Sequence, residues 1–138
     1  MRVDISTLQQ LQSFAEDFAQ TLINGDVIFL TGDLGSGKTT FTQLLLKSMG
    51  YPHRVKSPTY SLYERYEINK LIVYHMDLYR LSSAEELYYL AIDEIFNAHS
   101  IVLIEWPEKG FGALPDPSKS LDFEIKNSST RELKLQIT

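Results

Sequence analysis

The sequence of 138 residues predicts a single α/β domain, residues 1–138, with three layers and a mixed, mainly parallel sheet that contains antiparallel hairpins. Three observations carry this prediction. An apolar strand, Val27–Leu30, runs into a glycine-rich loop and then a helical segment, an order typical of parallel sheets. A second apolar run, Ile101–Ile104, has the composition of a buried strand. Alternating segments at 60–77 and 121–137 predict two hairpins.

The first third of the chain predicts two helices around one strand. Residues 7–24 form an amphipathic helix, because apolar side chains recur there at helical spacing. Ser6 and Gln9 stand at the spacing of an N-terminal capping box. The strand is Val27–Thr31, and the second helix spans Thr40–Met49, after which glycine and proline end it.

The rest of the chain is predicted to consist mostly of strands. Apolar patterns predict strands at Tyr60–Ile68, Leu71–Asp77, Ile101–Ile104, Leu121–Lys126 and Glu132–Ile137. Asn69-Lys70 is expected to form the tight turn of the first hairpin. A short helix is expected at 83–89, where two serines precede two glutamates at capping-box spacing. Residues 107–120 are rich in proline and glycine and predict a loop.

The composition excludes several classes of protein. Hydrophobic residues make up 43% and charged residues 22%, which is ordinary for a soluble domain, and no apolar run has membrane-spanning length. Without cysteine there are no disulfides and no thiolate metal ligands. We therefore expect a cytoplasmic protein. The net charge of −5 and the scattered basic residues argue against direct binding of nucleic acid, so any such role would run through a partner.

Residues 32–39, with the sequence GDLGSGKT, match the phosphate-loop pattern G-x-x-x-x-G-K-[ST]. The glycines let the backbone turn its N–H groups toward a phosphate, and the following helix adds a partial positive charge. Lys38 is expected to reach the β- and γ-phosphates, and the Thr39 hydroxyl to bind Mg²⁺. This segment predicts a P-loop NTPase-like fold. Its expected nucleotide-binding residues are Asp33, Gly35, Ser36, Gly37, Lys38, Thr39 and Thr40.

Two carboxylates end predicted strands and are candidates for the metal and water shell. Asp77 ends the segment that begins at Leu71, and Glu105 follows Ile101–Ile104. Ligands of open α/β sheets bind beyond the carboxyl ends of the strands, so both acids are well placed. We assign both to the shell around Mg²⁺, and Glu105 to the orientation or deprotonation of an attacking water. The alternative for each is a solvated strand end.

Three more residues near these segments have two possible roles each. Thr59, in Ser57-Pro58-Thr59, is placed to sense a γ-phosphate, or else its hydroxyl stabilises a local turn. Trp106 stacks beside the nucleotide or a partner, or else packs in the core. His75 and Asp77 share a face of one strand, which permits a contact, although a histidine packed in the core is the alternative.

Three function classes fit a phosphate loop of this kind unequally. A GTPase is disfavoured, because the nearest match to N-K-x-D, Asn69-Lys70-Leu71-Ile72, lacks the acid. A small nucleotide or metabolite kinase is a rival, but 138 residues leave little room for a lid and an acceptor site. A nucleotide-gated module without catalysis is the other alternative. The two strand-terminal acids favour hydrolysis over binding alone.

Five segments together resemble the bacterial TsaE family, formerly called YjeE. They are GDLGSGKTTF at 32–41, KSPTY at 56–60, YHMDLYRL at 74–81, EEL at 85–87 and IEWPE at 104–108. The resemblance covers nearly the whole chain, and the segments after the phosphate loop are the specific ones. It implies an Mg²⁺-dependent ATPase of the pathway that makes N6-threonylcarbamoyladenosine at tRNA adenosine 37. It also implies a complex with the TsaB–TsaD heterodimer, through which alone tRNA would be reached, and activity without partners is expected to be weak.

Carried over by position, the family's roles toward phosphate, metal, γ-phosphate and water fall on Lys38, Thr39, Thr59, Asp77 and Glu105, with Trp106 beside the site. The family's N-terminal segment lies near the base, which makes Thr7 a candidate for the adenine pocket. This sequence departs from the family at Ser36, commonly alanine, and at Gln43-Leu44, commonly an arginine–glycine pair. Ala91 replaces a common glycine, so we expect a negative φ there.

Overall fold

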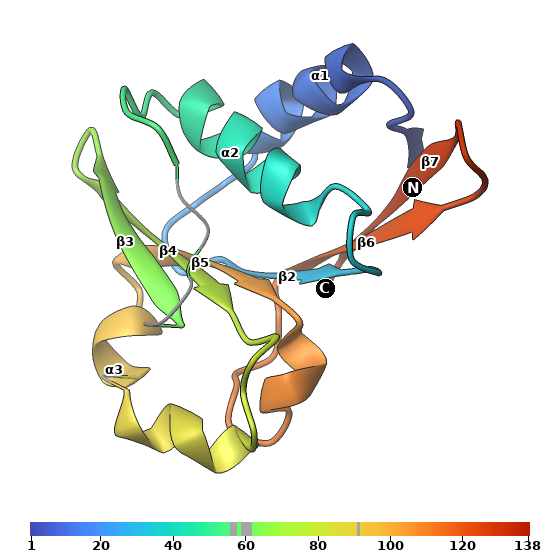
Figure 1. Ribbon diagram of the computed structural model, residues 1–138. Coiled ribbons are helices and arrows are strands. Elements are labelled where there is room, and N and C mark those ends of the chain that lie inside the picture. The colour runs from blue at the N-terminus through green and yellow to red at the C-terminus, as the bar shows by residue number, and fades with distance from the viewer. Residues whose placement is uncertain (56–57, 59–61, 91) are drawn as a thin grey trace.

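The computed structural model describes residues 1–55, 58, 62–90 and 92–138, and within these residues one sheet of seven strands forms the centre (Figure 1). The strands are β1 (Arg2–Asp4), β2 (Val27–Thr31), β3 (Tyr63–Ile68), β4 (Leu71–Asp77), β5 (Ser100–Glu105), β6 (Lys119–Ile125) and β7 (Arg131–Ile137). The helices are α1 (Leu8–Ala19), α2 (Lys38–Ser48) and α3 (Ile92–Ile95), with 3₁₀ helices η1 (Ala84–Tyr89) and η2 (Pro107–Gly110).

The strand order is β1-β7-β6-β2-β5-β4-β3, and the central strands β6, β2, β5 and β4 run parallel. Both edges are antiparallel, which confirms the mixed sheet and both hairpins. At the first hairpin, Asn69 and Lys70 both have positive φ, the geometry of a tight primed turn. Because β2, β4 and β5 are parallel, their carboxyl ends meet at one edge of the sheet, beside the glycine-rich loop.

Helices cover both faces of the sheet and give three layers (Figure 1). α1 and α2 lie on one face, while α3 and the two 3₁₀ helices lie on the other. The wholly buried Phe41 ties α2 into its layer, with its ring centroid 5.8 Å from those of Phe14 and Phe18 and 5.6 Å from that of Phe123. Truncation of such a ring to alanine typically costs about 3–5 kcal/mol. This packing fixes the N-terminus of α2 over the sheet.

The first helix has Thr7 as its N-cap residue, one position later than the predicted Ser6. The capping box is Thr7–Gln10, in which the Thr7 hydroxyl accepts from the Gln10 N–H at 3.1 Å. The predicted Ser6–Gln9 box is wrong, because the Ser6 hydroxyl donates to Asp4 and accepts from the N–H of Arg131. The helix ends at Ala19 rather than at residue 24.

Several elements in the rest of the chain differ from the sequence expectations. The edge strand β1 was not predicted, because three residues are too few for a recognisable alternation. The expected helix at 83–89 is the 3₁₀ helix η1, in which Ser83 makes no side-chain cap bond and Glu86 accepts from the Ser82 N–H at 2.8 Å. The expected loop after Trp106 contains η2. The predicted strand start at Tyr60 and the φ of Ala91 lie outside the described residues. No helix in the described part of the chain is long and apolar enough to cross a lipid bilayer.

Candidate functional site

The glycine-rich loop joins β2 to α2 and bends back over the end of the sheet. Gly32, Gly35 and Gly37 have φ of 138°, 77° and 113°, which side-chain-bearing residues rarely adopt. At Gly32 a Cβ atom would lie 2.4 Å from the Phe123 carbonyl oxygen, so the loop's approach to β6 also requires glycine. The turn leaves the N-terminus of the eleven-residue helix α2 facing the space above the loop.

Lys38, the first residue of α2, is only 5% exposed and points into the site. Its Nζ donates to the Gly32 carbonyl and lies 3.8 Å from the ring centroid of Trp106. Burial lowers the pKa of Lys38, although the nearby carboxylates of Glu105 and Glu108 act in the opposite direction. Among the described residues no carboxylate pairs directly with this ammonium. The site therefore holds a buried cation whose charge is available to an anion.

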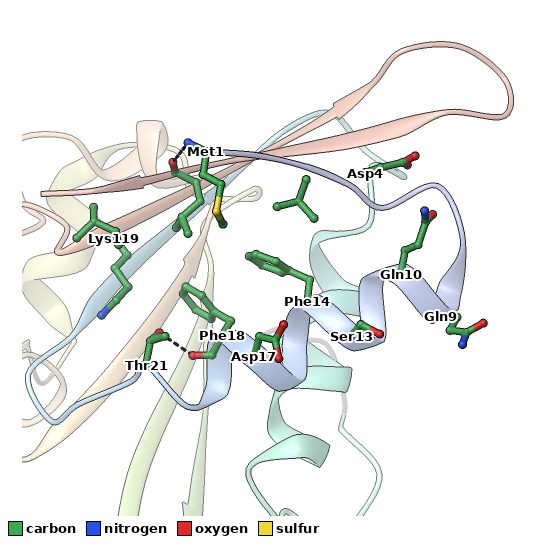
Figure 2. A pocket seen from close by; sticks show the side chains of 13 residues that line it. Met1, Asp4, Gln9, Gln10, Ser13, Phe14, Asp17, Phe18, Thr21 and Lys119 are labelled. Carbon is green, nitrogen blue, oxygen red and sulfur yellow. Dashed lines mark hydrogen bonds between the residues drawn. The ribbon is translucent and has the colours of Figure 1, made fainter.

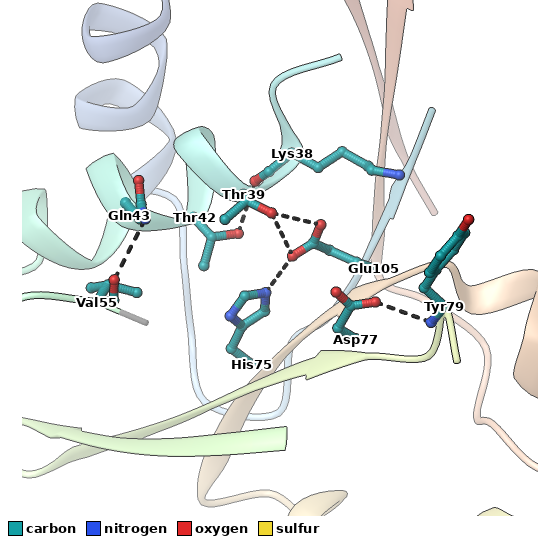
Figure 3. A network of polar contacts seen from close by, with 9 residues as sticks. All are labelled: Lys38, Thr39, Thr42, Gln43, Val55, His75, Asp77, Tyr79 and Glu105. Atoms are coloured by element: carbon teal, nitrogen blue, oxygen red, sulfur yellow. Dashed lines mark hydrogen bonds and ion pairs between the residues drawn. The ribbon is translucent and has the colours of Figure 1, made fainter. Parts of the chain in front are cut away.

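The two predicted acids meet at the edge of the sheet beside the loop. Asp77 and Glu105 are direct partners across the β4–β5 ladder. The Thr39 hydroxyl lies 3.2 Å and 3.4 Å from the two carboxylate oxygens of Glu105 (Figure 3). Thr39 belongs to α2 and Glu105 to β5, so packing of the helix on the sheet creates this contact. The hydroxyl and the acids thus converge as the sequence predicted.

The Asp77 carboxyl is partly buried and its Oδ1 accepts the Tyr79 N–H at 3.0 Å. Burial raises the pKa of Asp77, and the negative charge of Glu105 raises it further. The Tyr79 N–H, His75 and Lys38 oppose this shift. Two carboxylates beside each other in a partly dry site repel, and a cation between them would relieve that repulsion.

A histidine that is not among the described lining residues contacts Glu105. The His75 Nε2 is 2.6 Å from Glu105 Oε2, and both side chains are almost completely buried (Figure 3). The contact that the sequence permitted between His75 and Asp77 is thus made with Glu105 instead. Within the described part of the chain, His75 Nδ1 is a buried nitrogen without a hydrogen-bond partner.

These groups open into a pocket of about 260 Å³ over the phosphate loop. Its lining residues are Leu34, Gly35, Gly37, Lys38, Thr39, Thr40, Asp77, Tyr79, Glu105, Trp106 and Arg131. Trp106 has a φ of 57°, and this left-handed turn takes the chain out of β5 beside Tyr79, with ring centroids 5.0 Å apart. Arg131, the first residue of β7, also reaches the pocket, although no sequence pattern marked it.

The remaining predicted residues lie around this pocket or outside it. Asp33 and Ser36 belong to the loop, and the Ser36 hydroxyl is buried without a partner among the described residues. Thr7 is absent from the described lining, since its hydroxyl caps α1. Gln43 donates to the Val55 carbonyl at 3.4 Å, away from the loop (Figure 3). Thr59 lies outside the described residues.

A larger hollow of about 500 Å³ lies between α1 and the outer strands (Figure 2). Phe14 and Phe18 form its floor, and Gln9, Ser13 and Asp17 stand along its rim. It does not include the loop lysine or the two strand-terminal acids. The smaller pocket over the phosphate loop therefore concentrates the reactive groups.

The donors in the loop pocket fit Mg²⁺. Thr39, Asp77 and Glu105 supply hydroxyl and carboxylate oxygens, the ligand types that Mg²⁺ prefers. No group of three or more acidic or histidine side chains among the described residues could hold a metal without other ligands. Mg²⁺ typically uses few protein ligands and completes its shell with waters and substrate phosphates, so this sparse set suits it.

Comparisons with known proteins agree on one family. A family model described as "Threonylcarbamoyl adenosine biosynthesis protein TsaE" matches residues 5–134. The tRNA threonylcarbamoyladenosine biosynthesis protein TsaE of Haemophilus influenzae is 47% identical over 108 residues, covering 75% of this chain and 68% of the relative. The protein of the same name from Bacillus subtilis is 37% identical, covering 83% of this chain and 70% of the relative. The protein of this name from Rickettsia prowazekii is 34% identical, covering 92% of this chain and 88% of the relative.

The fold has a solved counterpart. The crystal structure of Bacillus subtilis YdiB superposes with a TM-score of 0.80 and 26% sequence identity, covering 99% of this chain and 84% of that chain. The predicted three-layer fold with a mixed sheet is thereby confirmed. The family resemblance carried by the five sequence segments is confirmed by the family model and the three relatives.

Proposed function

This chain belongs to the TsaE family of tRNA threonylcarbamoyladenosine biosynthesis proteins, and from this we propose that it binds ATP with Mg²⁺ and hydrolyses it for that pathway. The observation that carries the proposal is the convergence of Lys38, Thr39 and Glu105 on one pocket. Their residue types match the three needs of phosphoryl transfer, which are a cation for phosphate, a metal ligand and a group that orients water.

The phosphate loop and Lys38 would hold the triphosphate. Backbone N–H groups of the loop and the N-terminus of α2 favour negative charge at this position. The Lys38 ammonium needs only to leave the Gly32 carbonyl and the Trp106 ring to reach a phosphate oxygen. Arg131 lies at the pocket wall and adds a second positive charge. The pocket is thus built for an anion that carries its own counter-cation.

The Thr39 hydroxyl and the carboxylates of Asp77 and Glu105 would hold Mg²⁺, directly or through water. When bound, Mg²⁺ neutralises the charge that develops on the phosphate oxygens. Glu105 accepts a proton from the attacking water as the new oxygen–phosphorus bond forms. The bond between the γ-phosphorus and the bridging oxygen breaks, and ADP leaves.

We infer that the chain acts in the cytoplasm with the TsaB–TsaD heterodimer, and that tRNA is modified by the partners. The net charge of −5 supports this division of labour, because a protein that held tRNA alone would need a basic surface. Arg131 is the only arginine among the described lining residues, and it is exposed on the pocket rim. A partner that closes the pocket would therefore be expected to speed hydrolysis.

A pull-down with TsaB–TsaD, in ATP and in ADP, combined with phosphate release, tests the proposal. We expect association that depends on the nucleotide and phosphate release that rises with the partners. Nucleotide-dependent association without phosphate release would instead identify a non-catalytic assembly module. Transfer of the γ-phosphate to a small acceptor, without association, would identify a kinase.

A further inference from the structure

His75 is a wholly buried polar residue to which the proposed hydrolysis gives no task. We propose that His75 is a positioning residue that holds the Glu105 carboxylate in the orientation needed to act on water. The inference rests on the proposed ATP hydrolysis, and its basis is the 2.6 Å contact between His75 Nε2 and Glu105 Oε2.

The sheet register explains why these two side chains meet. His75 is the cross-strand partner of Leu103, and Asp77 that of Glu105. Residues two apart on a strand share a face, so His75 and Glu105 are diagonal neighbours on the face that α2 covers. The carboxylate of Glu105 leans back along the sheet toward the imidazole (Figure 3).

Two donors from different elements fix the Glu105 carboxylate. The Thr39 hydroxyl approaches from α2, and the His75 imidazole approaches from β4. The Thr39 contact is long, at 3.2 Å and 3.4 Å, and that hydroxyl is also the proposed metal ligand. If Thr39 bound a metal ion, His75 would remain as the contact that holds the carboxylate. Its single hydrogen bond therefore sets the direction of the other carboxylate oxygen.

The second ring nitrogen indicates which tautomer makes this bond. Nδ1 is buried and has no partner among the described residues. A proton at Nδ1 would leave a buried N–H donor unsatisfied, which costs more than an unsatisfied lone pair. The network thus assigns the proton to Nε2, which donates to the ionised carboxylate of Glu105.

A histidine kept for packing alone would behave differently. Its replacement by leucine would leave turnover unchanged once the variant had folded, and glutamine would be the worse substitute in an apolar interior. A positioning role reverses this order, because glutamine offers an N–H donor near the place of Nε2 and leucine offers none. In both cases ATP affinity should hold, since Lys38 and the loop do not contact the imidazole.

The test compares His75→Leu and His75→Gln with the wild type, and uses the exposed His99, replaced in the same two ways, as the control. We expect His75→Leu to lower the rate of phosphate release by about 10- to 100-fold. We expect His75→Gln to recover most of the wild-type rate. We expect the affinity for ATP, measured by calorimetry, to change less than about threefold in either variant, because the substituted side chain lies apart from the phosphate-binding residues. Thermal unfolding confirms that each variant is folded.

A second readout needs no catalysis. Long-range ¹H–¹⁵N spectra of the nucleotide-free protein should show His75 with its proton on Nε2, and Glu105→Gln should shift that signal while leaving the signals of His99 in place. If the wild type releases phosphate and His75→Leu releases it at the same rate, the positioning role is wrong and the proposed ATP hydrolysis stands. A wild type that releases none with TsaB–TsaD present would overturn the proposed function and this role with it. A proton found on Nδ1 would also overturn the role.

Discussion

The Thr39 hydroxyl lies 3.2 Å from the Glu105 carboxylate, although 66 positions separate the two residues in the chain. The contact exists because β5 lies directly beside β2, and α2 starts immediately after the loop that leaves β2. It joins a proposed metal ligand to the proposed water-activating acid. Changes on either side of this pair should therefore separate nucleotide binding from nucleotide hydrolysis.

Lys38→Ala should weaken ATP binding on the order of 100-fold, because charged hydrogen bonds of this kind contribute about 1.5–3 kcal/mol. Calorimetry with ATP and Mg²⁺ measures the loss. Lys47→Ala is the matched control, since Lys47 lies in the last turn of the same helix, away from the pocket. Equal affinity of Lys38→Ala and the wild type would refute the phosphate-loop assignment.

Trp106 should report nucleotide binding through its fluorescence. It is the single tryptophan of the chain, and the Lys38 ammonium lies 3.8 Å from its ring centroid. Phosphate binding should draw that ammonium off the ring, so emission should change and saturate as ATP is titrated. The change should vanish in Lys38→Ala. Unchanged emission at saturating ATP would mean that the lysine does not move as proposed.

Arg131→Ala should weaken nucleotide binding modestly, by up to about fivefold, because an exposed charge contributes at most about 1 kcal/mol. Arg131 lines the pocket from the outer hairpin. Arg2→Ala serves as the control, since Arg2 pairs with Glu132 of the same outer strand β7 at 2.7 Å and does not line the pocket. If both variants bind ATP equally well, Arg131 has no part in recognition.

Asp77→Asn should raise the thermal stability of the metal-free protein at neutral pH. Burial, and then the charge of Glu105, raise the pKa of Asp77 above its ordinary value of 3.8, so the ionised carboxyl destabilises the folded state. That penalty is absent below the unfolded-state pKa and complete above the raised folded-state pKa. The melting temperature of the variant should therefore exceed that of the wild type increasingly as pH rises through this window.

Asparagine keeps an oxygen for the Tyr79 N–H, so the local hydrogen bond survives the substitution. Thermal unfolding of both proteins from about pH 3 to pH 7 brackets the ordinary carboxyl pKa. A variant that is less stable than the wild type at pH 7 would show that Asp77 stabilises the fold as an ion.

Much of the site could be predicted because its parts are local in sequence. The loop pattern fixes Lys38 and Thr39 together, and an apolar strand that ends in an acid marks Glu105. The parallel arrangement then brings strand ends to one edge, as expected for this class of sheet. These inferences need only short-range patterns and one general rule of topology.

The contacts that were missed depend on register and on pairing between distant strands. Arg131 reaches the pocket only because β6 pairs with β2 and carries the final hairpin beside the loop. His75 of β4 and Glu105 of β5 are diagonal neighbours in the sheet, and the spacing of residues in the sequence does not show which residues of two strands face each other. The helix start was misplaced by one residue because Ser6 and Thr7 are each followed three positions later by glutamine. The tertiary bonds of Ser6 decide between them.

The most direct test is phosphate release from ATP and Mg²⁺ by the chain with TsaB–TsaD, for the wild type and for Glu105→Ala, at saturating nucleotide. We expect both proteins to bind ATP with similar affinity. We expect the variant to release phosphate about 10²- to 10⁴-fold more slowly, the usual contribution of a positioned general base. Wild-type turnover in Glu105→Ala would contradict the assignment of Glu105 and move the water-activating role elsewhere, first to Asp77.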